Sequence, residues 1–554
     1  MPRMTRHPQV TRLSPRAVSL RVGNCVGCSI MVCHGWLDRP WRGRGDSLGR
    51  RLLNRLVGTS APCLEAGFRP PARSNPASAV VGMARRMVAV AAVLLVTGCT
   101  DEDAPPRVIE TPAPTGWASE LNADPLPVGW MLSEVREDCL LAPGVRLHRI
   151  IRGSPSVEPL PLPCEQIRQS VQFGGGSLAS VFVSGPYVFH VLELDPSVFE
   201  GRLEPALAQG QIAGKATTSQ MANSRGALAA MNAGFFVVGP GGTGDAAAQM
   251  GDDGMAGDPA GVTALSGQLI SEAVGSREAL LFDATGHQLR FPRTSTALTL
   301  QAGSVRALVD GLNRVPGAIR NCGGVGGDSP TEAARHDVTC TDADELVVYT
   351  SHWGQATAPV DGLEAVLGED GQLLSTRTPG GAIPAQGRVV VATGARVAEL
   401  EAMLATAQPL QLDVELKLEG ESGELSSGQH LLNGGPGLLR VGAVALTDAQ
   451  GGFRHPDNPF FGLTWVDGPN PRTLVGRTAS GRWLLVVCDG RQPDWSVGLP
   501  LRDAARVMQH LGATDAMNLD GGGSSTLVVH GQVVNRPSDG AERPVSDALL
   551  IVTE

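Results

Sequence analysis

The segment Met517–Val529 constrains this chain more than any other part of its sequence. It reads MNLDGGGSSTLVV, so an acid, three glycines and three hydroxyl side chains lead directly into an apolar run. Glycine has no Cβ, so the backbone N–H groups of consecutive glycines can turn towards a ligand. Grouped N–H donors bind anions without adding a formal charge. The sequence therefore predicts a strand, a glycine loop that can bind an anion, and a second strand.

Short polar motifs accompany this loop along the chain. They are Met231-Asn232-Ala233-Gly234-Phe235-Phe236, Asn470-Pro471-Arg472, Asp489-Gly490-Arg491-Gln492 and Asn535-Arg536-Pro537. Guanidinium groups fit phosphate oxygens in a bidentate way. We therefore expect a phosphate site, and its expected residues are Arg472, Arg491, Arg536, Arg543, Gly521, Gly522, Gly523, Ser524, Ser525, Asn232 and Asn518.

In their order and spacing these motifs resemble the phosphodiester glycosidase family. The resemblance is densest over about 460–554 and reaches back, with weaker matches, to about 140. The turn Asn433-Gly434-Gly435-Pro436 is similar to a further element of that family. The resemblance implies an α+β fold with mixed β-sheets and a few flanking helices. It also implies cleavage of a sugar phosphodiester that releases free sugar and a phosphomonoester.

The expected chemistry needs few carboxylates. A phosphate monoester is a weakly basic leaving group, so it hardly needs protonation. Of the usual pair of glycosidase carboxylates, only the one that acts at the anomeric carbon is then required. Asp520 is the first candidate and Asp489 the second, because each follows an apolar strand and precedes glycine. Each could equally cap a turn, and any single arginine could serve a surface ion pair. No metal or cofactor is expected, although the acidic pair Asp252-Asp253 permits a structural cation.

Two other functions stay open at this point. The first is a non-catalytic surface lipoprotein that binds polysaccharide through the same loop. The second, more distant, is a serine esterase, but its nucleophile elbow needs Gly-x-Ser-x-Gly between a strand and a helix. Here the serines lead into an apolar strand-like run.

The first 82 residues differ from the rest of the chain. They hold thirteen arginines against three acids, whereas the whole chain has a net charge of −10. Residues 83–98 combine a charged start, a short apolar run and a small residue before Cys99, which is typical of a secretory signal. The ending Val96-Thr97-Gly98-Cys99 resembles the lipobox of bacterial lipoproteins. We therefore expect residues 1–82 to be a spurious or disordered extension, and Cys99 to carry lipid.

A lipid on Cys99 would anchor an exported protein to the bacterial cell envelope. Residues 99–125 would then form a tether, which is acidic and proline-rich from Asp101 to Pro114. The strongly acidic remainder argues against nucleic acid as a partner, because phosphate backbones select basic surfaces. Export favours disulfides, and the expected pairs are Cys139–Cys164 and Cys322–Cys340, with Cys488 left over in a buried strand.

Coarse patterning divides the remaining chain. Residues 126–225 are expected to form a β-rich portion that packs on a phosphodiester glycosidase domain over 226–554. Strands are expected at 187–195, 345–350 and 388–392, and helices at 222–231, 396–405 and 500–511, from their residue types and apolar periodicity. The Gly- and Asp-rich residues 239–261 are expected to form a flap over the site.

Overall fold

The computed structural model describes residues 117–129, 132–164, 168–173, 185–238, 257–317, 319, 327, 329–330, 340–420, 424–454 and 462–554. The chain divides into two compact units, Met1–Pro105 and Pro106–Glu554, and every described residue belongs to the second. The predictions for 1–82, the signal 83–98, the lipidated Cys99, Cys322 and most of the flap, including Asp252 and Asp253, lie outside the described residues.

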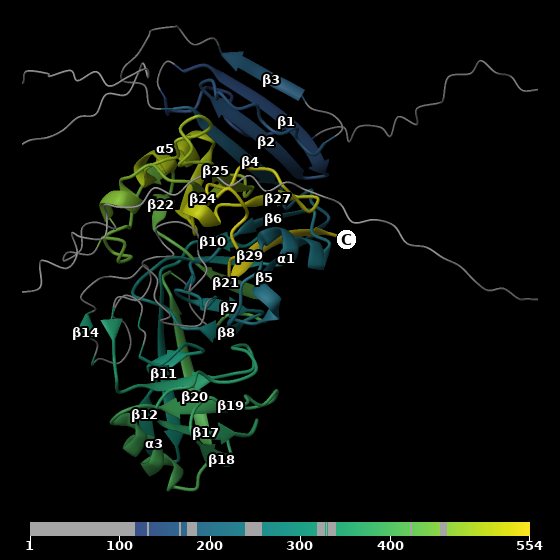
Figure 1. Cartoon of the computed structure of the whole chain (residues 1–554). Helices are drawn as coiled ribbons and strands as arrows, with labels where there is room; N and C mark the ends of the chain where they lie inside the picture. The colour runs from purple at the N-terminus through teal and green to yellow at the C-terminus, as the bar shows by residue number, and fades with distance from the viewer. Residues whose placement is uncertain are drawn as a thin grey trace, which may run out of the picture. The chain divides into compact units, whose positions relative to one another are not determined.

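A nine-stranded sheet forms the largest layer, in the order β23-β22-β26-β24-β25-β4-β2-β1-β3 (Figure 1). Its strands are β1 Glu134–Ala142, β2 Val145–Arg152, β3 Arg168–Phe173, β4 Tyr187–Leu194, β22 Gly437–Arg440, β23 Ala443–Val444, β24 Arg472–Thr478, β25 Trp483–Cys488 and β26 Ala513–Asn518. Antiparallel pairing of β4 with β25 joins the N-terminal strands to the C-terminal ones. Main-chain hydrogen bonds therefore join strands of the predicted 126–225 portion and strands of the predicted 226–554 domain in one sheet.

A five-stranded sheet packs on one face of this layer, in the order β28-β27-β6-β29-β5. Its strands are β5 Gly201–Leu207, β6 Ala229–Asn232, β27 Leu527–Val529, β28 Gln532–Val533 and β29 Asp547–Thr553. The core between the two sheets includes Leu192, Val475, Met517, Met231, Leu527 and Leu549. Burying each such side chain stabilises the fold by about 1.5–3 kcal/mol.

Helix α5 (Leu501–His510) covers the other face of the large sheet. Leu501, Ala504, Ala505 and Met508 recur at helical spacing and are buried there with Leu474 and Val486. The helix agrees with the one expected over 500–511, and Gly512, with φ +107°, follows its end. The large sheet is therefore covered on both faces.

A third sheet adjoins these layers, with the order β10-β9-β21-β7-β8. Its strands are β7 Thr263–Leu265, β8 Gln268–Ser271, β9 Ala279–Asp283, β10 Leu289–Arg290 and β21 Gln429–Asn433. The chain between β10 and β21 builds a lobe with its own core, which includes Leu298, Leu300, Leu346, Val390, Leu400 and Met403. The sequence patterns did not reveal this lobe.

The lobe contains two sheets and helix α3 (Arg396–Leu404) (Figure 1). The sheets hold β11 Thr294–Ala302, β12 Val305–Leu308 and β20 Leu410–Leu418, and β13 Gly311–Leu312, β16 Leu346–Tyr349, β17 Leu363–Leu367, β18 Leu373–Arg377 and β19 Arg388–Ala392. A small hairpin joins β14 Ser329–Pro330 to β15 Cys340–Thr341. Buried Arg314 ties the lobe to the third sheet, because it pairs with Glu345 and, at 3.1 Å, with Glu272.

The expected fold class is confirmed only in its sheets. The described residues are mainly β, with three α-helices, so the α+β label overstates the helical part. Among the described strands, only β13 and β16 pair in parallel. The strands expected at 187–195, 345–350 and 388–392 are confirmed as β4, β16 and β19. No described helix is long and apolar enough to cross a membrane.

The helix expected at 222–231 is shifted in the structure. Helix α1 runs over Thr218–Arg225, and β6 begins at Ala229. Thr217 and Gln220 form a capping box at its start, and Gly226 adopts φ +61° at its end. These capping residues fix the bounds more strongly than the apolar pattern used for the prediction.

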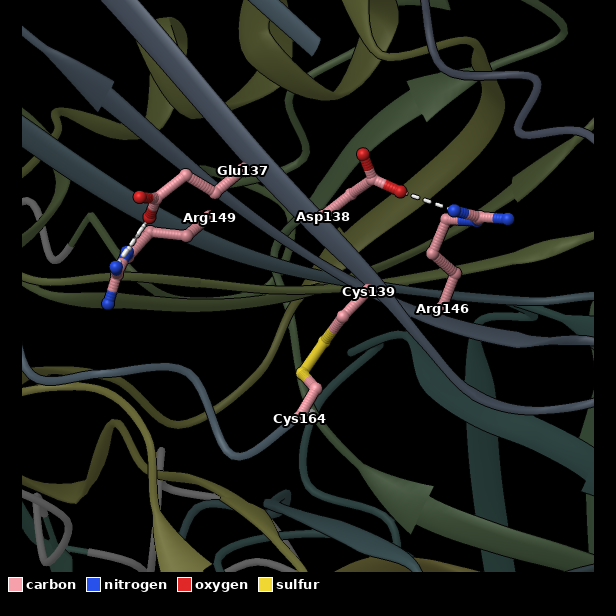
Figure 2. The surroundings of a disulfide bond; sticks show 6 residues. All are labelled: Glu137, Asp138, Cys139, Arg146, Arg149 and Cys164. Atoms are coloured by element: carbon pink, nitrogen blue, oxygen red, sulfur yellow. Dashed lines mark hydrogen bonds and ion pairs between the residues drawn. A yellow bond between two sulfur atoms is a disulfide. The ribbon is translucent and has the colours of Figure 1, made fainter. Parts of the chain in front are cut away.

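The predicted disulfide Cys139–Cys164 is present (Figure 2). Two cross-strand ion pairs, Glu137–Arg149 and Asp138–Arg146, lie beside it between β1 and β2. Cys488 is a free, buried cysteine in β25, as expected. Because Cys322 is outside the described residues, its pairing with Cys340 stays a prediction.

The described end of the predicted tether is docked on the fold. Trp117 Nε1 donates to Asp195 Oδ2 at 2.8 Å, and the indole ring lies between the guanidinium groups of Arg146 and Arg482, 5.4 and 4.9 Å from its centroid. Leu126 is buried in the core beside α5. Trp117 and Leu126 are therefore held against the fold, and residues 99–116 of the predicted tether lie outside the described residues.

Candidate active site

The predicted motifs converge at the end of β6, where Asn232 holds the glycine loop. Asn232 Nδ2 donates to the Asp520 carbonyl at 2.7 Å, and Oδ1 accepts from Thr526 N–H at 3.0 Å and Thr473 Oγ1–H at 2.9 Å. The Asp520 N–H donates to the Ala233 carbonyl at 2.9 Å. Asn232 is fully buried. Its side-chain amide is therefore hydrogen-bonded to the main chain at both ends of the loop.

Each glycine of the loop is in close contact with a different group. A Cβ on Gly521 would lie 2.9 Å from the Pro471 carbonyl oxygen. Gly522 has φ +62°, and its Cβ would lie 3.0 Å from the Arg491 guanidinium. A Cβ on Gly523 would overlap Arg543 Nη2 and both carboxylate oxygens of Asp539. Any side chain larger than hydrogen would push these charged groups away from the loop.

Two cations and two carboxylates surround the loop. Arg543 forms an ion pair with Asp539 through Nε at 2.8 Å and Nη2 at 2.7 Å. Arg491 donates from Nε and Nη2 to Asn470 Oδ1 at 3.0 and 2.8 Å. Burial and the Arg543 cation lower the pKa of Arg491, against the opposing effect of the Asp539 and Asp520 carboxylates. An anion at the loop would relieve this repulsion between the two guanidinium groups.

Arg491 also has a strained backbone. Its φ is +59°, a region that costs a non-glycine residue of order 1–3 kcal/mol. Strain of this kind clusters at ligand sites, where the surrounding structure enforces it. The conformation, together with the two bonds to Asn470, sets the guanidinium over Gly522.

Three hydroxyls at the end of the loop lack partners. Ser524 Oγ, Ser525 Oγ and Thr526 Oγ1 are buried and make no hydrogen bond within the described part of the chain. Leaving such a group unsatisfied costs about 1–3 kcal/mol. The loop thus keeps uncompensated donors, as expected of a site that receives a polar ligand.

A second polar cluster lies on the other side of Asn232. Gly234 N–H donates to Asp547 Oδ1 at 2.7 Å, and Phe235 N–H donates to Asn433 Oδ1 at 2.8 Å. A Cβ on Gly234 would lie 2.6 Å from Asn433 Nδ2 and 2.8 Å from Asp547 Oδ2. Burial raises the pKa of Asp547 to about 6, against the hydrogen bonds from Gly234 and Ser546. Asp547 was not predicted, because an acid that opens an apolar strand resembles a simple strand start.

Asn518 is held by the turn that follows β21. Its Nδ2 donates to the Gly435 carbonyl at 3.0 Å, and its own carbonyl accepts from Gly435 N–H at 2.8 Å. Asn518 Oδ1 is buried and makes no hydrogen bond in the described structure. The segment Asn433–Pro436 is therefore hydrogen-bonded to the end of β26, two residues before Asp520.

Asp489 lies inside the fold. Its carboxylate accepts from Trp495 Nε1 at 2.7 Å, Asn535 Nδ2 at 3.0 Å and Arg536 N–H at 3.1 Å. Its side chain has 0% exposure. The carboxylate thus fastens the Asn535-Arg536 segment to the end of β25, which suits a positioning role better than attack on a substrate.

The predicted arginines separate into two groups. Arg472 is buried, donates to the carbonyls of Leu499 at 2.7 Å and Gly468 at 3.2 Å, and lies over the Trp465 ring. Burial and the Arg491 cation lower its pKa to about 9. The Arg536 guanidinium lies 5.9 Å from the centre of the Trp495 ring. The structure thus brings the predicted Arg491 and Arg543, together with the unpredicted Asp539, against the loop glycines, and gives Arg472 and Arg536 other partners.

The missed Asp539 had a signal in the sequence. Ser538-Asp539-Gly540 reads as a turn, and Arg543 follows it at a spacing of four. Within the described residues, no group of three or more His, Cys, Asp or Glu could hold a metal ion.

Comparisons with known proteins show what the part of the chain around this site is similar to. Residues 361–552 match the family model described as phosphodiester glycosidase. A prophage-derived Bacillus subtilis protein is 38% identical over 90 residues, or 16% of this chain and 14% of the relative. Mouse N-acetylglucosamine-1-phosphodiester alpha-N-acetylglucosaminidase is 32% identical over 111 residues, or 20% of this chain and 21% of the enzyme. The chain therefore matches only about a fifth or less of these relatives' lengths.

Solved structures extend the likeness over more of the fold. A candidate exported protein of Burkholderia pseudomallei is 28% identical with a TM-score of 0.64, covering 79% of this chain and 100% of its own. A Synechocystis protein shares the fold alone, at 19% identity and a TM-score of 0.50 over 75% of each chain. The glycine loop, Arg491 and the Arg543–Asp539 pair all lie within the matched 361–552 range. Over residues 361–552, this chain therefore matches the phosphodiester glycosidase family.

Proposed function

We propose that this protein hydrolyses the glycosidic bond of a sugar phosphodiester, releasing free sugar and a phosphomonoester. The observation that carries the proposal is the loop Asp520–Thr526, which joins three crowded glycines, three unpartnered hydroxyls and two guanidinium groups. Such a loop can bind a phosphodiester by hydrogen bonds and charge together. The family assignment supports the same bond type.

In this proposal the phosphate of the substrate lies between the loop and Arg491. The bond between the anomeric carbon and the phosphate oxygen breaks, and its electron pair leaves with the phosphomonoester. Arg491 and Arg543 stabilise the growing charge on that leaving group, so it departs with little need for a proton. Water supplies the hydroxyl of the free sugar, and its proton passes to a carboxylate or to solvent.

Asp520 is the carboxylate we assign to the anomeric carbon. It lies at the entrance of the loop, whereas Asp489 is enclosed by Trp495, Asn535 and Arg536. Asp539 forms the ion pair that keeps Arg543 against Gly523. Asp489 and Asp539 are therefore positioning residues in this scheme, and Asp520 is the catalytic one.

The substrate and location belong to the same proposal. An exported enzyme, lipid-anchored through Cys99 to the bacterial cell envelope, would act on an envelope or extracellular glycan. The Burkholderia neighbour, itself named as a candidate exported protein, supports export. The lipobox-like segment before Cys99 supports the anchor. Neither line of support identifies the sugar.

The decisive experiment measures sugar release from a panel of glycosyl phosphodiesters by the full chain. We expect the wild type to release free sugar and phosphomonoester, and Asp520→Asn to reduce the rate at least about a hundredfold. The variant Asp515→Asn, which changes a carboxylate on β26, the strand that precedes Asp520, is the matched control. Tight binding of a phosphoglycan by a folded wild type, with no release from any substrate, would instead indicate a binding lipoprotein.

A further inference from the structure

A row of polar side chains crosses the inner face of the large sheet. Glu137 on β1 pairs in register with Arg149 on β2, and Arg149 pairs in register with His190 on β4 (Figure 2 shows the first pair). His190 in turn is opposite Val487 on β25, two residues before Asp489. Because alternate residues share a face, all four polar side chains lie on one side of the sheet.

His190 is the unusual member of this row. It is 1% exposed, and neither Nδ1 nor Nε2 makes a hydrogen bond within the described residues. Its Nε2 lies 3.5 Å from Asp489 Oδ2, which is close but not aligned for a hydrogen bond. Glu137 and Arg149 satisfy each other, and Asp489 is satisfied by Trp495, Asn535 and Arg536. The imidazole is therefore left with unused hydrogen-bonding capacity in the interior, which is costly.

A cavity of about 210 Å³ lies against this histidine. Its lining combines apolar side chains with three groups that can bind an anion, and consists of His190, Arg149, Arg536, Trp495, Val157, Glu158, Leu160, Val534 and Asn535. Arg149 is already paired with Glu137, whereas the Arg536 guanidinium makes no ion pair among the described residues and rests on the Trp495 ring. One cation and one imidazole thus face a mostly apolar space.

We propose that this cavity binds a small organic acid with an apolar body and one anionic head group. The anionic head group would accept hydrogen bonds from His190 and Arg536. It would thereby supply the hydrogen-bond partner that the buried imidazole lacks. The body would rest against Val157, Leu160 and Val534. This site is distinct from the glycine loop, because none of the loop residues lines the cavity.

The test uses benzoate as the probe and titration calorimetry on the full chain. We expect benzoate to bind with a roughly millimolar Kd, as suits a ligand of this size. His190→Gln should weaken binding at least about tenfold by removing the hydrogen bond to the head group. Leu160→Trp, at a residue 63% exposed on the rim, should fill the entrance and weaken binding similarly without unfolding the protein. Leu308→Trp, at a residue 53% exposed on β12, is the matched control and should bind as the wild type does.

Two further measurements distinguish binding in this cavity from binding at the glycine loop. Inorganic phosphate lacks an apolar body and should not displace benzoate, and Asp520→Asn should bind benzoate unchanged. The proposal is overturned if benzoate fails to bind the folded wild type, or if His190→Gln and Leu160→Trp bind it as the wild type does. Displacement of benzoate by phosphate would also overturn it, since the probe would then occupy the glycine loop.

Discussion

The side-chain amide of Asn232 donates to the main-chain carbonyl of Asp520 at 2.7 Å, across 288 residues of sequence. The same side chain accepts from Thr526 N–H at the far end of the loop. Asn232 is therefore hydrogen-bonded on both sides of the glycines, although it precedes Asp520 by 288 residues. The position of Asp520 depends on an element that folds from a distant part of the sequence.

Asn232→Ala should destabilise the protein and disturb the loop together. The substitution leaves the Asp520 carbonyl, the Thr526 N–H and the Thr473 hydroxyl without their buried partner. We expect a loss of about 3 kcal/mol in the free energy of unfolding, measured by urea denaturation. Thr473→Val removes only one of these bonds and should cost about 1 kcal/mol. Equal losses in the two variants would contradict the bracing role of Asn232.

Gly523→Ala should abolish anion binding while leaving most of the fold intact. The new methyl group would overlap the Arg543–Asp539 ion pair and displace it from the loop. We expect sugar release, or phosphate binding, to fall at least about a hundredfold, because a cation placed for the leaving group moves away. Gly428→Ala is the control, since a Cβ there meets no atom within 4 Å. Full activity in Gly523→Ala would remove Arg543 from the proposed site.

The sheet-forming segments could be predicted because they carry local signals. Tyr187–Leu194 is rich in β-branched and aromatic residues, and it is β4. Leu501, Ala504 and Met508 recur at helical spacing, and they lie in α5. Strands β16 and β19 of the lobe between β10 and β21 were predicted, but the lobe as a unit was not, because its sheets are held by pairings such as β11 with β20, more than one hundred residues apart. Non-local pairing of this kind leaves no mark on local periodicity.

The site could be predicted in its motifs but not in its contacts. Arg491 lies against Gly522, as its motif predicted. Arg472 and Asp489 come from similar motifs, but their side chains form hydrogen bonds inside the fold instead. Side-chain direction decides between these roles, and it depends on the face of the strand that each residue occupies. Asp539 was missed because its importance comes from contact with Gly523 and Arg543, which only the folded loop brings together.

Removal of the disulfide should destabilise the N-terminal strands. Cys139 and Cys164 are separated by 25 residues, and the bond limits the unfolded chain to a smaller ensemble. Cys139→Ser with Cys164→Ser should lower the free energy of unfolding by about 3 kcal/mol. The reference is Cys488→Ser, which changes a free cysteine in β25 and tests for a general effect of the substitution. A double variant as stable as the wild type would show that β1 and β2 are held by their pairing alone.

Asp547 should make stability fall as pH rises. Its pKa is about 6 in the folded protein against an ordinary value of 3.8, so between these values the folded state binds more protons than the unfolded state. The free energy of unfolding therefore decreases with pH from about 4 to about 6, by roughly 3 kcal/mol in total for this group. Asp547→Asn keeps an oxygen that can accept from Gly234 N–H but cannot ionise, so its profile should lack this decrease. Urea denaturation of both proteins at pH 4, 5, 6 and 7 measures the difference, and parallel profiles would show that Asp547 is ionised in the folded state at pH 4.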